Sequence, residues 1–482
     1  MNWLHPLAEF WPHLAAGFSF LASLIASIHA VLNKRDSRAA ALWLGFIWLL
    51  PLLGPVLYLA LGVNRIRRHA QSLRVGRGPG AAIPKPIPED MGEPQRPEAE
   101  HLRILARVVD RVATQPLVAG NRVQALVNGD EAYPAMLDAI EKANVSVSLA
   151  TYIFDNDRAG KRFAGALGRA VARGVQVRVL IDDAGARYSW PSIVGKLKRA
   201  HIPVARFLPT LAPWRLTTMN LHNHRKLIVA DGRIGFTGGI NIREGNMLAD
   251  RPRRPVQDLH FKVEGPVVTQ LQEAFANDWA FTTDEVLAGD AWFPELKESG
   301  NAIARVVTDG PDVDLDKLRW TLLGALSCAQ SSVRILTPYF LPDPSLITAL
   351  NLAALRGVKV DIILPGKNNL PVVHWASRAM WWQVLERGCR LWLTPPPFDH
   401  SKLMIVDNHW VFLGSANWDP RSLRLNFELN VECYGREFAD AMEAVVQSKL
   451  RGAKPVTLEE VDGRPLPVKL RDGVARLFTP YL

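Results

Sequence analysis

The side chains best suited to catalysis stand in two copies of one motif, His-x-Lys-x4-Asp. The first copy consists of His224, Lys226 and Asp231, and the second of His400, Lys402 and Asp407. Each residue of the second copy follows its counterpart by 176 positions, and the same interval separates Asn241 from Asn417. A motif with three fixed residues seldom recurs by chance, so the aligned copies indicate a duplicated chain.

The spacing within each motif suits a cleft lined from a β-strand. Side chains two positions apart on a strand point to the same face, so His224 and Lys226 should face one cleft, as should their counterparts in the second copy. Ammonium and amide groups can hold the non-bridging oxygens of a phosphodiester while negative charge builds up on them. The candidates for binding the substrate phosphate are Lys226, Asn241, Lys402 and Asn417.

Two histidines beside one phosphorus atom can divide the work. One imidazole can attack phosphorus to give a phospho-histidine, while the other protonates the departing alkoxide and later deprotonates the incoming hydroxyl. Side chains supply the cations, so we expect neither a metal ion nor another cofactor. Each imidazole needs its other nitrogen held by a carboxylate. Asp258 and Glu428 follow the motifs at similar places and are the candidates for that role.

The motif aspartates have a second interpretation. Asp231-Gly232 and Asp407-Asn408 follow strand-like runs and are typical of two-residue hairpin turns. We therefore expect these carboxylates to hold a turn more readily than to carry a proton, although both belong to the candidate catalytic set. Asp182 and Asp183 end another strand-like run, and we interpret them as a strand-end cap or loop support.

The halves show the same order of predicted elements. Strand-like runs at 148–154 and 334–340 are followed by helical patterns that stop at Gly174 and Gly357, and then by hydrophobic runs at 177–181 and 360–364. A strand, a helix stopped by glycine and a second strand indicate a βαβ unit. The prediction is an α/β fold of two pseudo-symmetric halves, 101–290 and 291–482, packed face to face with the site at their junction.

The N-terminal 64 residues predict a membrane hairpin. The apolar runs 14–32 and 39–63 contain no charged residue, and each is long enough to cross about 30 Å of hydrocarbon as a helix. Lys and Arg are absent before Glu9, which argues against a cleaved signal peptide. Pro51, Gly54 and Pro55 allow the second run to be kinked or re-entrant instead of a straight span.

The charges beside the hairpin suggest its orientation. Five arginines follow the second run between 65 and 77, against three basic residues in the turn at 33–38, so the catalytic part is expected on the cytoplasmic side. The proline-rich and glycine-rich stretch 65–100 is interpreted as a linker. The whole chain carries a net charge of +10, which favours an anionic partner. Its three cysteines are too few and too far apart for a disulfide framework.

Taken together, the paired motifs resemble those of the phospholipase D superfamily, and the chain as a whole resembles the bacterial cardiolipin synthases. The resemblance rests on the hairpin end 52–62, on Asn223-His224-Arg225-Lys226, on 338–343, on 414–430 and on the C-terminal 476–482. It covers nearly the full length apart from the linker. Gly238-Gly239 departs from the Gly-Ser that many relatives carry, and Asp258 lacks the Asn-Phe-Glu context of Glu428.

The resemblance implies a transphosphatidylation in the bacterial inner membrane. Phosphatidylglycerol would form a phosphatidyl-His224 intermediate with His400 as acid and base, and a second phosphatidylglycerol would then give cardiolipin. The reverse assignment of the histidines stays open. The alternatives are a phosphodiesterase that hydrolyses phospholipid or nucleic acid, and a non-catalytic membrane scaffold. The hairpin favours lipid over nucleic acid as the partner, because a nuclease gains nothing from membrane anchoring.

Aromatic residues near the motifs have two interpretations each. Trp375, Met380, Trp381 and Trp382 lie on a predicted helix at 374–386. They can line an acyl-chain groove, but core packing is the favoured interpretation. Pro213, Trp214 and Met219 precede the first motif and can belong to a lipid entrance or to an ordinary surface loop.

Overall fold

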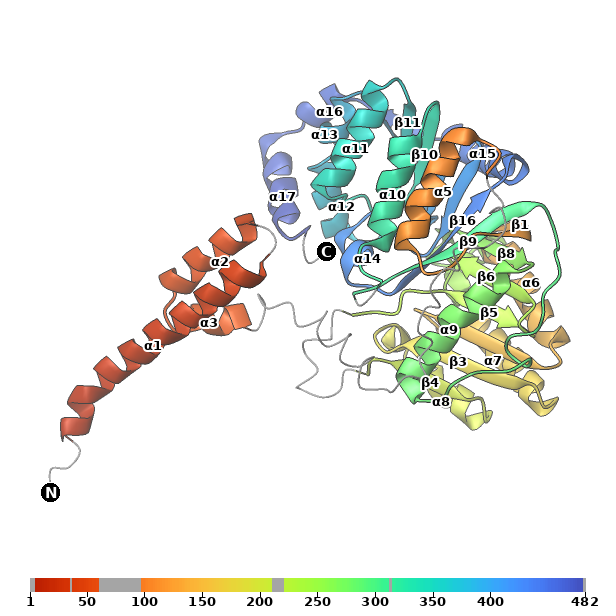
Figure 1. The fold of residues 1–482 in the computed structure, drawn as a ribbon, viewed down its shortest axis with the longest axis horizontal. Helices are drawn as coiled ribbons and strands as arrows, with labels where there is room; N and C mark the ends of the chain where they lie inside the picture. The colour runs from red at the N-terminus through yellow and green to blue at the C-terminus, as the bar shows by residue number, and fades with distance from the viewer. Residues whose placement is uncertain (1–4, 35–36, 60–96, 210–220, 312–313, 480–482) are drawn as a thin grey trace.

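A computed structural model describes residues 5–34, 37–59, 97–209, 221–311 and 314–479 of the chain. Most of the predicted linker and the predicted entrance residues Pro213, Trp214 and Met219 lie outside these ranges. The described residues form two α/β halves, shown from orange to green and from teal to blue in Figure 1, and a separate group of N-terminal helices.

One continuous sheet of fifteen strands runs through both halves. In spatial order the strands of the second half are β17 (Lys454–Val456), β12 (Arg390–Thr394), β11 (Lys359–Pro365), β10 (Ser332–Leu336), β14 (Leu403–Val406), β15 (Trp410–Gly414), β16 (Glu428–Tyr434) and β9 (Ala302–Asp309). The sheet continues with β1 (Val118–Val127), β8 (Leu259–Glu264), β6 (Ile234–Gly238), β5 (Leu227–Ala230), β2 (Ser146–Thr151), β3 (Gln176–Asp182) and β4 (Val204–Phe207).

This order mirrors itself about the antiparallel β1–β9 pair, as a duplication with a pseudo-twofold axis requires. The sequence led us to expect halves packed face to face, but it gave no sign of this shared edge. Their sheets are joined by backbone hydrogen bonds instead of by side-chain packing alone. The β1–β9 ladder therefore contributes to the junction of the halves.

The predicted βαβ units are present in both halves. The parallel pairs β2–β3 and β10–β11 are connected by α7 (Arg158–Ala172) and α11 (Pro344–Leu355). Gly174 and Gly357 end these helices with φ of 87° and 91°, a conformation that costs a side-chain-bearing residue energy. The remaining helices of the halves are α6 (Asn128–Lys142), α8 (Val194–Arg199), α9 (Val267–Thr283), α10 (Lys317–Cys328), α12 (Pro371–Arg378), α13 (Trp382–Leu385), α14 (Pro420–Arg424), α15 (Arg436–Leu450), α16 (Leu458–Asp462) and α17 (Leu466–Leu477).

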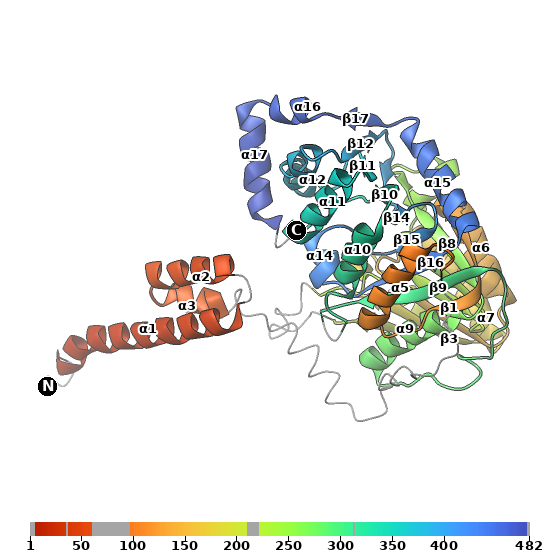
Figure 2. The same cartoon turned by 45° about the horizontal axis from the view of Figure 1, so that its top comes forward.

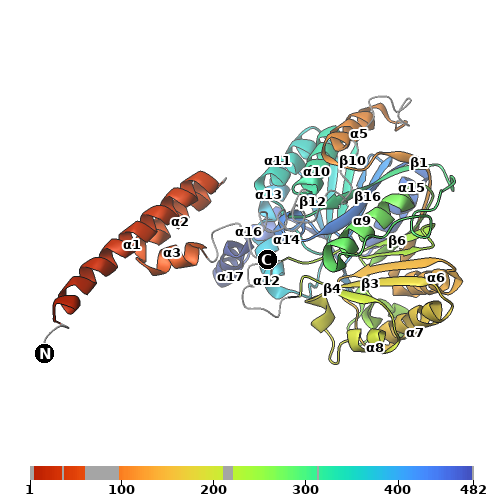
Figure 3. The ribbon, with the colours of Figure 1, turned by 60° about the horizontal axis from the view of Figure 1, so that its bottom comes forward.

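Three hydrophobic cores hold the halves together. One lies under α6, α7 and α8 in the first half, and one under α10, α11 and α12 in the second. The third lies between them and combines strands of both halves with α9 and α15. Figure 3 shows α9 and α7 on opposite sides of the first-half strands. Because the central core draws on both halves, neither half is an independent packing unit.

Helix α5 (Glu100–Val112) does not follow the predicted division of the chain at residue 101. Its residues Leu102, Leu105 and Val109 belong to the core of the second half, where α5 packs beside α10. The periodicity of α5 predicts a helix but carries no information about its partner. The N-terminal part of the predicted first half thus packs on the second half.

The N-terminal group consists of α1 (His5–Asn33), α2 (Ser37–Leu49) and α3 (Leu53–Leu57). Among the described residues, one helical stretch, His13–Asn33, is long and apolar enough to cross a bilayer. The second apolar run is broken at Pro51 and Leu52 into two short helices, α2 and α3. Both lie beside α1 in Figure 1. The described part of the second run thus has the kinked form that the sequence allowed as an alternative to a straight span.

The predicted helix at 374–386 is also broken. It divides into α12 and α13, and Met380 and Trp381 are buried in the core between them, whereas Trp375 is half-buried. Trp382 is 42% exposed. Core packing is therefore confirmed for Met380 and Trp381, and Trp382 faces solvent.

Candidate active site

Each motif lies on an extended segment that leads into a strand. His224 and Lys226 immediately precede β5, and His400 and Lys402 precede β14, so the side chains stand at the ends of these strands instead of within them. All four side chains are largely buried. The spacing argument placed them on a strand, whereas the structure places them at its start, where they can still approach a ligand.

The two segments are held by the opposite half of the molecule. The His224 backbone N–H donates to the Phe427 carbonyl at 2.9 Å, and the His400 N–H donates to the Gln257 carbonyl at 2.7 Å. A short parallel pair, β7 (Val256–Gln257) with β13 (Phe398–Asp399), reinforces the second of these contacts. Each motif is therefore aligned beside the residue that precedes a carboxylate of the other half.

This alignment crosses the carboxylates between the halves. His224 Nδ1 lies 3.0 Å from Glu428 Oε2, and His400 Nδ1 lies 2.8 Å from Asp258 Oδ2. The sequence nominated both carboxylates but did not indicate which histidine each would contact. Because Nδ1 is occupied in both rings, each Nε2 remains for a ligand.

Helices of the central core fix the neighbours of each histidine. Asp278 on α9 accepts hydrogen bonds at 2.8 Å from Asn223 Nδ2 and from Arg225 Nη1, on either side of His224. In the second half, Lys449 on α15 donates to Asp399, which precedes His400, at 2.5 Å. The backbone at both motifs is thus held by buried charged groups, which limits its freedom to move during a reaction.

Burial brings the lysine pKa values close to neutrality. Burial lowers the pKa of Lys226 to about 7, assisted by the charge of Lys402, although Glu428 opposes the shift. The pKa of Lys402 falls to about 8 for the same first reason, against the opposing charges of Asp258 and Glu428. Each lysine Nζ donates to the backbone carbonyl of its own motif histidine. These lysines would gain from an anionic ligand that stabilises their charged form.

The charges that shift the histidine pKa values come from both motifs. Burial lowers the pKa of His224 to about 4, with Glu428 opposing and both Lys226 and Lys402 adding to the shift. Burial also holds the pKa of His400 well below its ordinary value, assisted by Lys402, Lys226 and His224. Since cationic groups of both halves act on each imidazole, the motifs share one electrostatic environment.

The motif aspartates lie at the turns that end β5 and β14. Asp231 accepts hydrogen bonds from the backbone N–H groups of Asn144, Val145 and Ser146, and Asp407 from those of Gln330, Ser331 and Ser332. Both have positive φ, 51° and 52°. These contacts tie each hairpin to the start of β2 or β10, and none of them involves a motif histidine or lysine.

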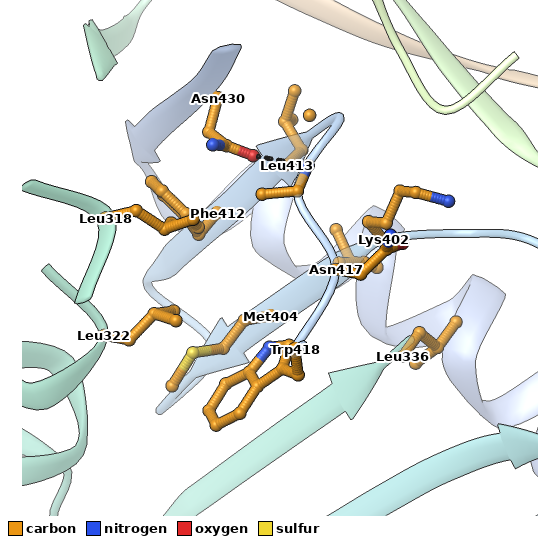
Figure 4. A pocket seen from close by; sticks show the side chains of 13 residues that line it. Leu318, Leu322, Leu336, Lys402, Met404, Phe412, Leu413, Asn417, Trp418 and Asn430 are labelled. Atoms are coloured by element: carbon orange, nitrogen blue, oxygen red, sulfur yellow. Dashed lines mark hydrogen bonds between the residues drawn. The ribbon is translucent and has the colours of Figure 1, made fainter. Parts of the chain in front are cut away.

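The two asparagines differ in their contacts. Asn241 Oδ1 accepts a hydrogen bond from the Ile153 N–H at 3.0 Å. Within the described part of the chain, the buried Asn417 Oδ1 has no hydrogen-bond partner. Asn417 and Lys402 border a mostly apolar cavity whose wall includes Leu322, Met404 and Trp418 (Figure 4). Asn417 is thus the asparagine with an acceptor atom left for a donor.

Two tyrosines complete the walls of the site, and sequence reasoning did not assign them a role. The Tyr152 ring lies edge-on to His224 at 5.2 Å between centroids, and Lys226 Nζ lies 5.6 Å from the centre of that ring. Tyr339 has the corresponding position beside His400, at 6.3 Å. Their signal was available, because both lie near the end of the first strand-like run of their half, 148–154 or 334–340.

The interpretation of Asp182 as a loop support is confirmed. Its carboxylate accepts hydrogen bonds from the N–H groups of Ala184 and Gly185, and from that of Asn223 at 2.8 Å. His222 Nδ1 lies 3.3 Å from the same carboxylate. Asp182 therefore connects the end of β3 to the residue before His224. Asp183 forms ion pairs with Arg187 and Arg206.

Comparisons with known proteins show the family of the chain. The sequence model described as "Cardiolipin synthase, PLD-like domain" matches residues 136–279 and 322–450, and "Phospholipase_D-nuclease N-terminal" matches 21–62. The cardiolipin synthase of Geobacillus sp. (strain WCH70) is 30% identical over 98% of this chain and 96% of its own. Cardiolipin synthase A of Pseudomonas fluorescens is 32% identical over 98% and 99%, and the major cardiolipin synthase of Bacillus subtilis is 31% identical over 96% and 98%.

The chain belongs to the cardiolipin synthase family of the phospholipase D superfamily. It is thus a phosphatidyltransferase of that family, and the resemblance noted in the sequence is confirmed. A solved phosphatidylserine synthase from Haemophilus influenzae shares the fold, with a TM-score of 0.62 and 15% identity over 78% of this chain and all of that one.

Within this cardiolipin synthase fold the two histidine–carboxylate pairs differ. Ser415 Oγ donates to Glu428 at 2.5 Å, and Asn426 Nδ2 donates to it at 3.2 Å. Gly239 takes the place of Ser415 in the first half, and a Cβ atom there would lie 2.2 Å from Asp258 Oδ1. The first half therefore has Gly239 instead of serine because the Asp258 carboxylate occupies the space that a side chain at position 239 would need.

The two carboxylates also differ in pKa, which is raised for Asp258 and lowered for Glu428. Burial raises the pKa of Asp258 to about 7, although Lys402 opposes the shift. Burial also acts to raise the pKa of Glu428, but His224, Lys226 and the Ser415 hydroxyl bring it below its ordinary value. The pair with His224 therefore contains a charged carboxylate, and the pair with His400 retains a proton more readily.

Proposed function

We propose that this enzyme joins two phosphatidylglycerol molecules into cardiolipin and releases glycerol. The observation that carries the proposal is the crossed arrangement in which two histidines, each held by a carboxylate of the other half, share one electrostatic environment with two buried lysines. A single phosphodiester suits this arrangement, because the negative charge of its non-bridging oxygens stabilises the protonated forms of Lys226 and Lys402. One phosphodiester replaces another, so the reaction needs no external energy source.

In the first step, His224 Nε2 attacks the phosphorus of phosphatidylglycerol. A nitrogen–phosphorus bond forms, and the bond to the glycerol headgroup oxygen breaks. His400 Nε2 gives a proton to that oxygen, and glycerol leaves. Lys226 and Lys402 stabilise the charge on the equatorial oxygens, and we propose that Asn241 and Asn417 assist them. The product is a phosphatidyl-histidine.

In the second step, the headgroup hydroxyl of another phosphatidylglycerol attacks the same phosphorus. His400 Nε2, now neutral, removes the hydroxyl proton, and the nitrogen–phosphorus bond breaks. Cardiolipin leaves, and both histidines return to their starting protonation states. Water must be kept from replacing the lipid alcohol, which a recessed site makes possible because both imidazoles are only slightly exposed.

The difference between the two pairs supports His224 as the nucleophile. An imidazole that attacks must be neutral at Nε2 and gains from a charged partner that stabilises the cation formed later. His224 beside the charged Glu428 meets both conditions. An imidazole that first acts as an acid needs a proton in its pair, and His400 with Asp258 meets that condition better.

The enzyme is proposed to work at the cytoplasmic face of the inner membrane. Helix α1 contains a stretch long enough to span the bilayer, and the basic residues after the second apolar run outnumber those in the turn. We propose that α2 and α3 are embedded beside α1, so that the N-terminal group is a hairpin in the membrane. Nucleic acid is not proposed as a substrate.

A product assay tests this function. The purified chain is given vesicles whose phosphatidylglycerol carries a labelled headgroup, and lipids and released glycerol are quantified. We expect one glycerol for each cardiolipin and little phosphatidic acid. Phosphatidic acid as the main product would show a hydrolase, and absence of any product would show a scaffold. Adding phosphatidylethanolamine and measuring ethanolamine release tests whether the donor can vary.

Variants link the products to the proposed site. His224→Ala and His400→Ala should each lower the rate at least about 10³-fold, because the pair acts as one unit. His201→Ala is the matched control, since His201 is exposed and none of the contacts described for the site involves it. Substantial cardiolipin formation by either motif variant contradicts the two-histidine scheme.

A further inference from the structure

Helix α17 packs on the second half with its polar side inward. Asp472 is only 1% exposed and accepts hydrogen bonds from Arg464 and Arg471 and, on α12, from Arg378, at 2.8 to 2.9 Å for the nearest atoms. The Arg471 guanidinium also lies 4.5 Å from the centre of the Trp375 ring. The ionic cluster fixes α17 against α12, with Ala475 as the other buried residue of the helix.

The opposite side of α17 is an exposed apolar stripe. It consists of Leu466 (77% exposed), Leu470 (66%), Val474 (48%) and Leu477 (71%), and it continues at Phe478 (54%), directly after the helix. Spacings of four, four and three place the first four side chains on one face of the helix. A surface helix of a water-soluble domain buries such a stripe, so α17 is inverted relative to the usual arrangement.

Basic residues border the stripe. Lys469 and Arg476 are both exposed and lie on the same flank of the helix, seven positions apart. Arg471 lies on the other flank, and Asp472, the one acidic residue of α17, is already shared among three arginines. An apolar stripe with a basic border is complementary to an anionic bilayer surface, where long basic side chains reach the phosphates.

The position of α17 connects this surface with the site. In Figure 2, as in the other two views, the C-terminal end of α17 comes close to α14. Helix α14 begins two residues after Trp418 and directly after Asp419, in the segment that carries Asn417. The helix against which α17 packs also starts with exposed apolar residues, Leu370 and Val372.

We infer that α17 is a second membrane contact, lying in the interface of an anionic bilayer with its apolar stripe among the acyl chains. Lys469 and Arg476 then meet lipid phosphates. With α1 in the membrane, as proposed above, this contact forms within one tethered molecule and need not be strong by itself. The inference rests on the surface of α17 and not on the proposed reaction.

Spin labelling of the full-length protein tests the inference without an activity measurement. The label is placed by Leu470→Cys in a Cys328→Ser background, since the other two cysteines are buried. Val286→Cys is the matched control, because Val286 is 68% exposed and lies in the first half. In vesicles that contain phosphatidylglycerol, we expect the ratio of collisions with oxygen to collisions with a water-soluble nickel complex to be at least about threefold higher at position 470 than at position 286.

Two results would overturn the inference. A label at position 470 that is as open to the nickel complex as the control label means that the stripe stays in water. A label shielded from both oxygen and nickel means that protein covers it, from a second copy or another partner.

A charge test sharpens the assignment to anionic lipid. Lys469→Glu with Arg476→Glu should bring the collision ratio at position 470 toward the control value, whereas Lys469→Arg with Arg476→Lys should preserve it. Equal ratios for both double variants would contradict the role of the basic border.

Discussion

At the scale of single residues, the two histidines are distinguished by their carboxylates. Glu428 is held by Ser415 and Asn426 as well as by His224, whereas Asp258 contacts His400 and the N–H group of Leu259. The two motifs are thus alike in sequence, but their histidine–carboxylate pairs differ in charge. That difference gives each substitution a different expected effect on the two chemical steps.

Glu428→Gln should slow the formation of the phosphatidyl-enzyme by about 10²- to 10⁴-fold, because an amide cannot stabilise the cationic imidazole or fix its tautomer in the same way. Asp258→Asn should be milder in that step when the leaving group is a good one. Rapid-mixing measurements of the first turnover check both variants. Equal losses of rate in both variants, with a good leaving group as well as with glycerol, would argue against distinct roles of the two carboxylates.

The pKa values predict a loss of activity on the alkaline side. The lysines bind phosphate only when protonated, so kcat/KM should fall as the pH rises through the pKa of Lys226, about 7, and that of Lys402, about 8. His224 is neutral above its pKa of about 4, so no acid limb is expected near the ordinary histidine value. A pH profile of kcat/KM tests both statements.

Lys226→Arg provides the control for the alkaline limb. Arginine stays charged throughout the range, so the variant should move the limb to higher pH even if its overall rate is lower. A limb that stays in place would assign it to another group.

The sequence nominated the residues of the site but not their pairing. The two motifs, their asparagines and both carboxylates were proposed from position in the repeat, and the structure pairs each motif histidine with one of those carboxylates. Their catalytic roles stay predictions. The crossing of Glu428 to His224 depends on backbone contacts between halves, such as His224 to Phe427, which leave no pattern in one sequence.

At the scale of elements, Asp407 illustrates a motif residue whose contacts are structural. It accepts hydrogen bonds from three successive backbone N–H groups at the start of β10, and from His101 on α5 at 2.9 Å. Asp407→Asn should lower the free energy of unfolding by about 1–3 kcal/mol while kcat of the folded enzyme changes little. Denaturant unfolding and a rate per folded molecule separate the two effects. A large loss of kcat at unchanged stability would return Asp407 to the catalytic set.

Gly239 tests the fit between a turn and a carboxylate. In Gly239→Ser the new side chain would displace Asp258, so the rate should fall by at least about tenfold through the mispositioned His400. The matched change in the other half, Ser415→Gly, removes one hydrogen bond to Glu428 and creates no clash. A greater loss in Ser415→Gly than in Gly239→Ser would contradict this steric explanation.

The periodicity of the sequence predicted which helices and strands exist, but it did not predict where they are broken. The βαβ units and their glycine stops were predicted from alternation and helical spacing. Pro51 made a kink in the second apolar run possible, but sequence alone did not decide between a kink and a straight span. The division of the predicted helix 374–386 at Ala379 follows from packing Met380 and Trp381 into the core, which local propensity does not register.

At the scale of the whole molecule, the site exists only because the halves are joined. The β1–β9 pair makes one sheet of both, and each half supplies the carboxylate for the other half's histidine. Duplication predicted pseudo-symmetry, but the shared sheet edge and the passage of α5 onto the second half required the three-dimensional structure. We expect the two imidazoles to act on one phosphorus atom, with His224 forming the covalent bond.

Trapping of the covalent intermediate tests these roles of the two histidines. A phosphatidyl ester of p-nitrophenol needs no proton to release its leaving group, so His400→Ala should give one equivalent of p-nitrophenol and then stall. Mass spectrometry of the digested protein should find the phosphatidyl group on His224, and His224→Ala should give neither burst nor adduct. An adduct on His400, or a full burst from His224→Ala, would contradict the account.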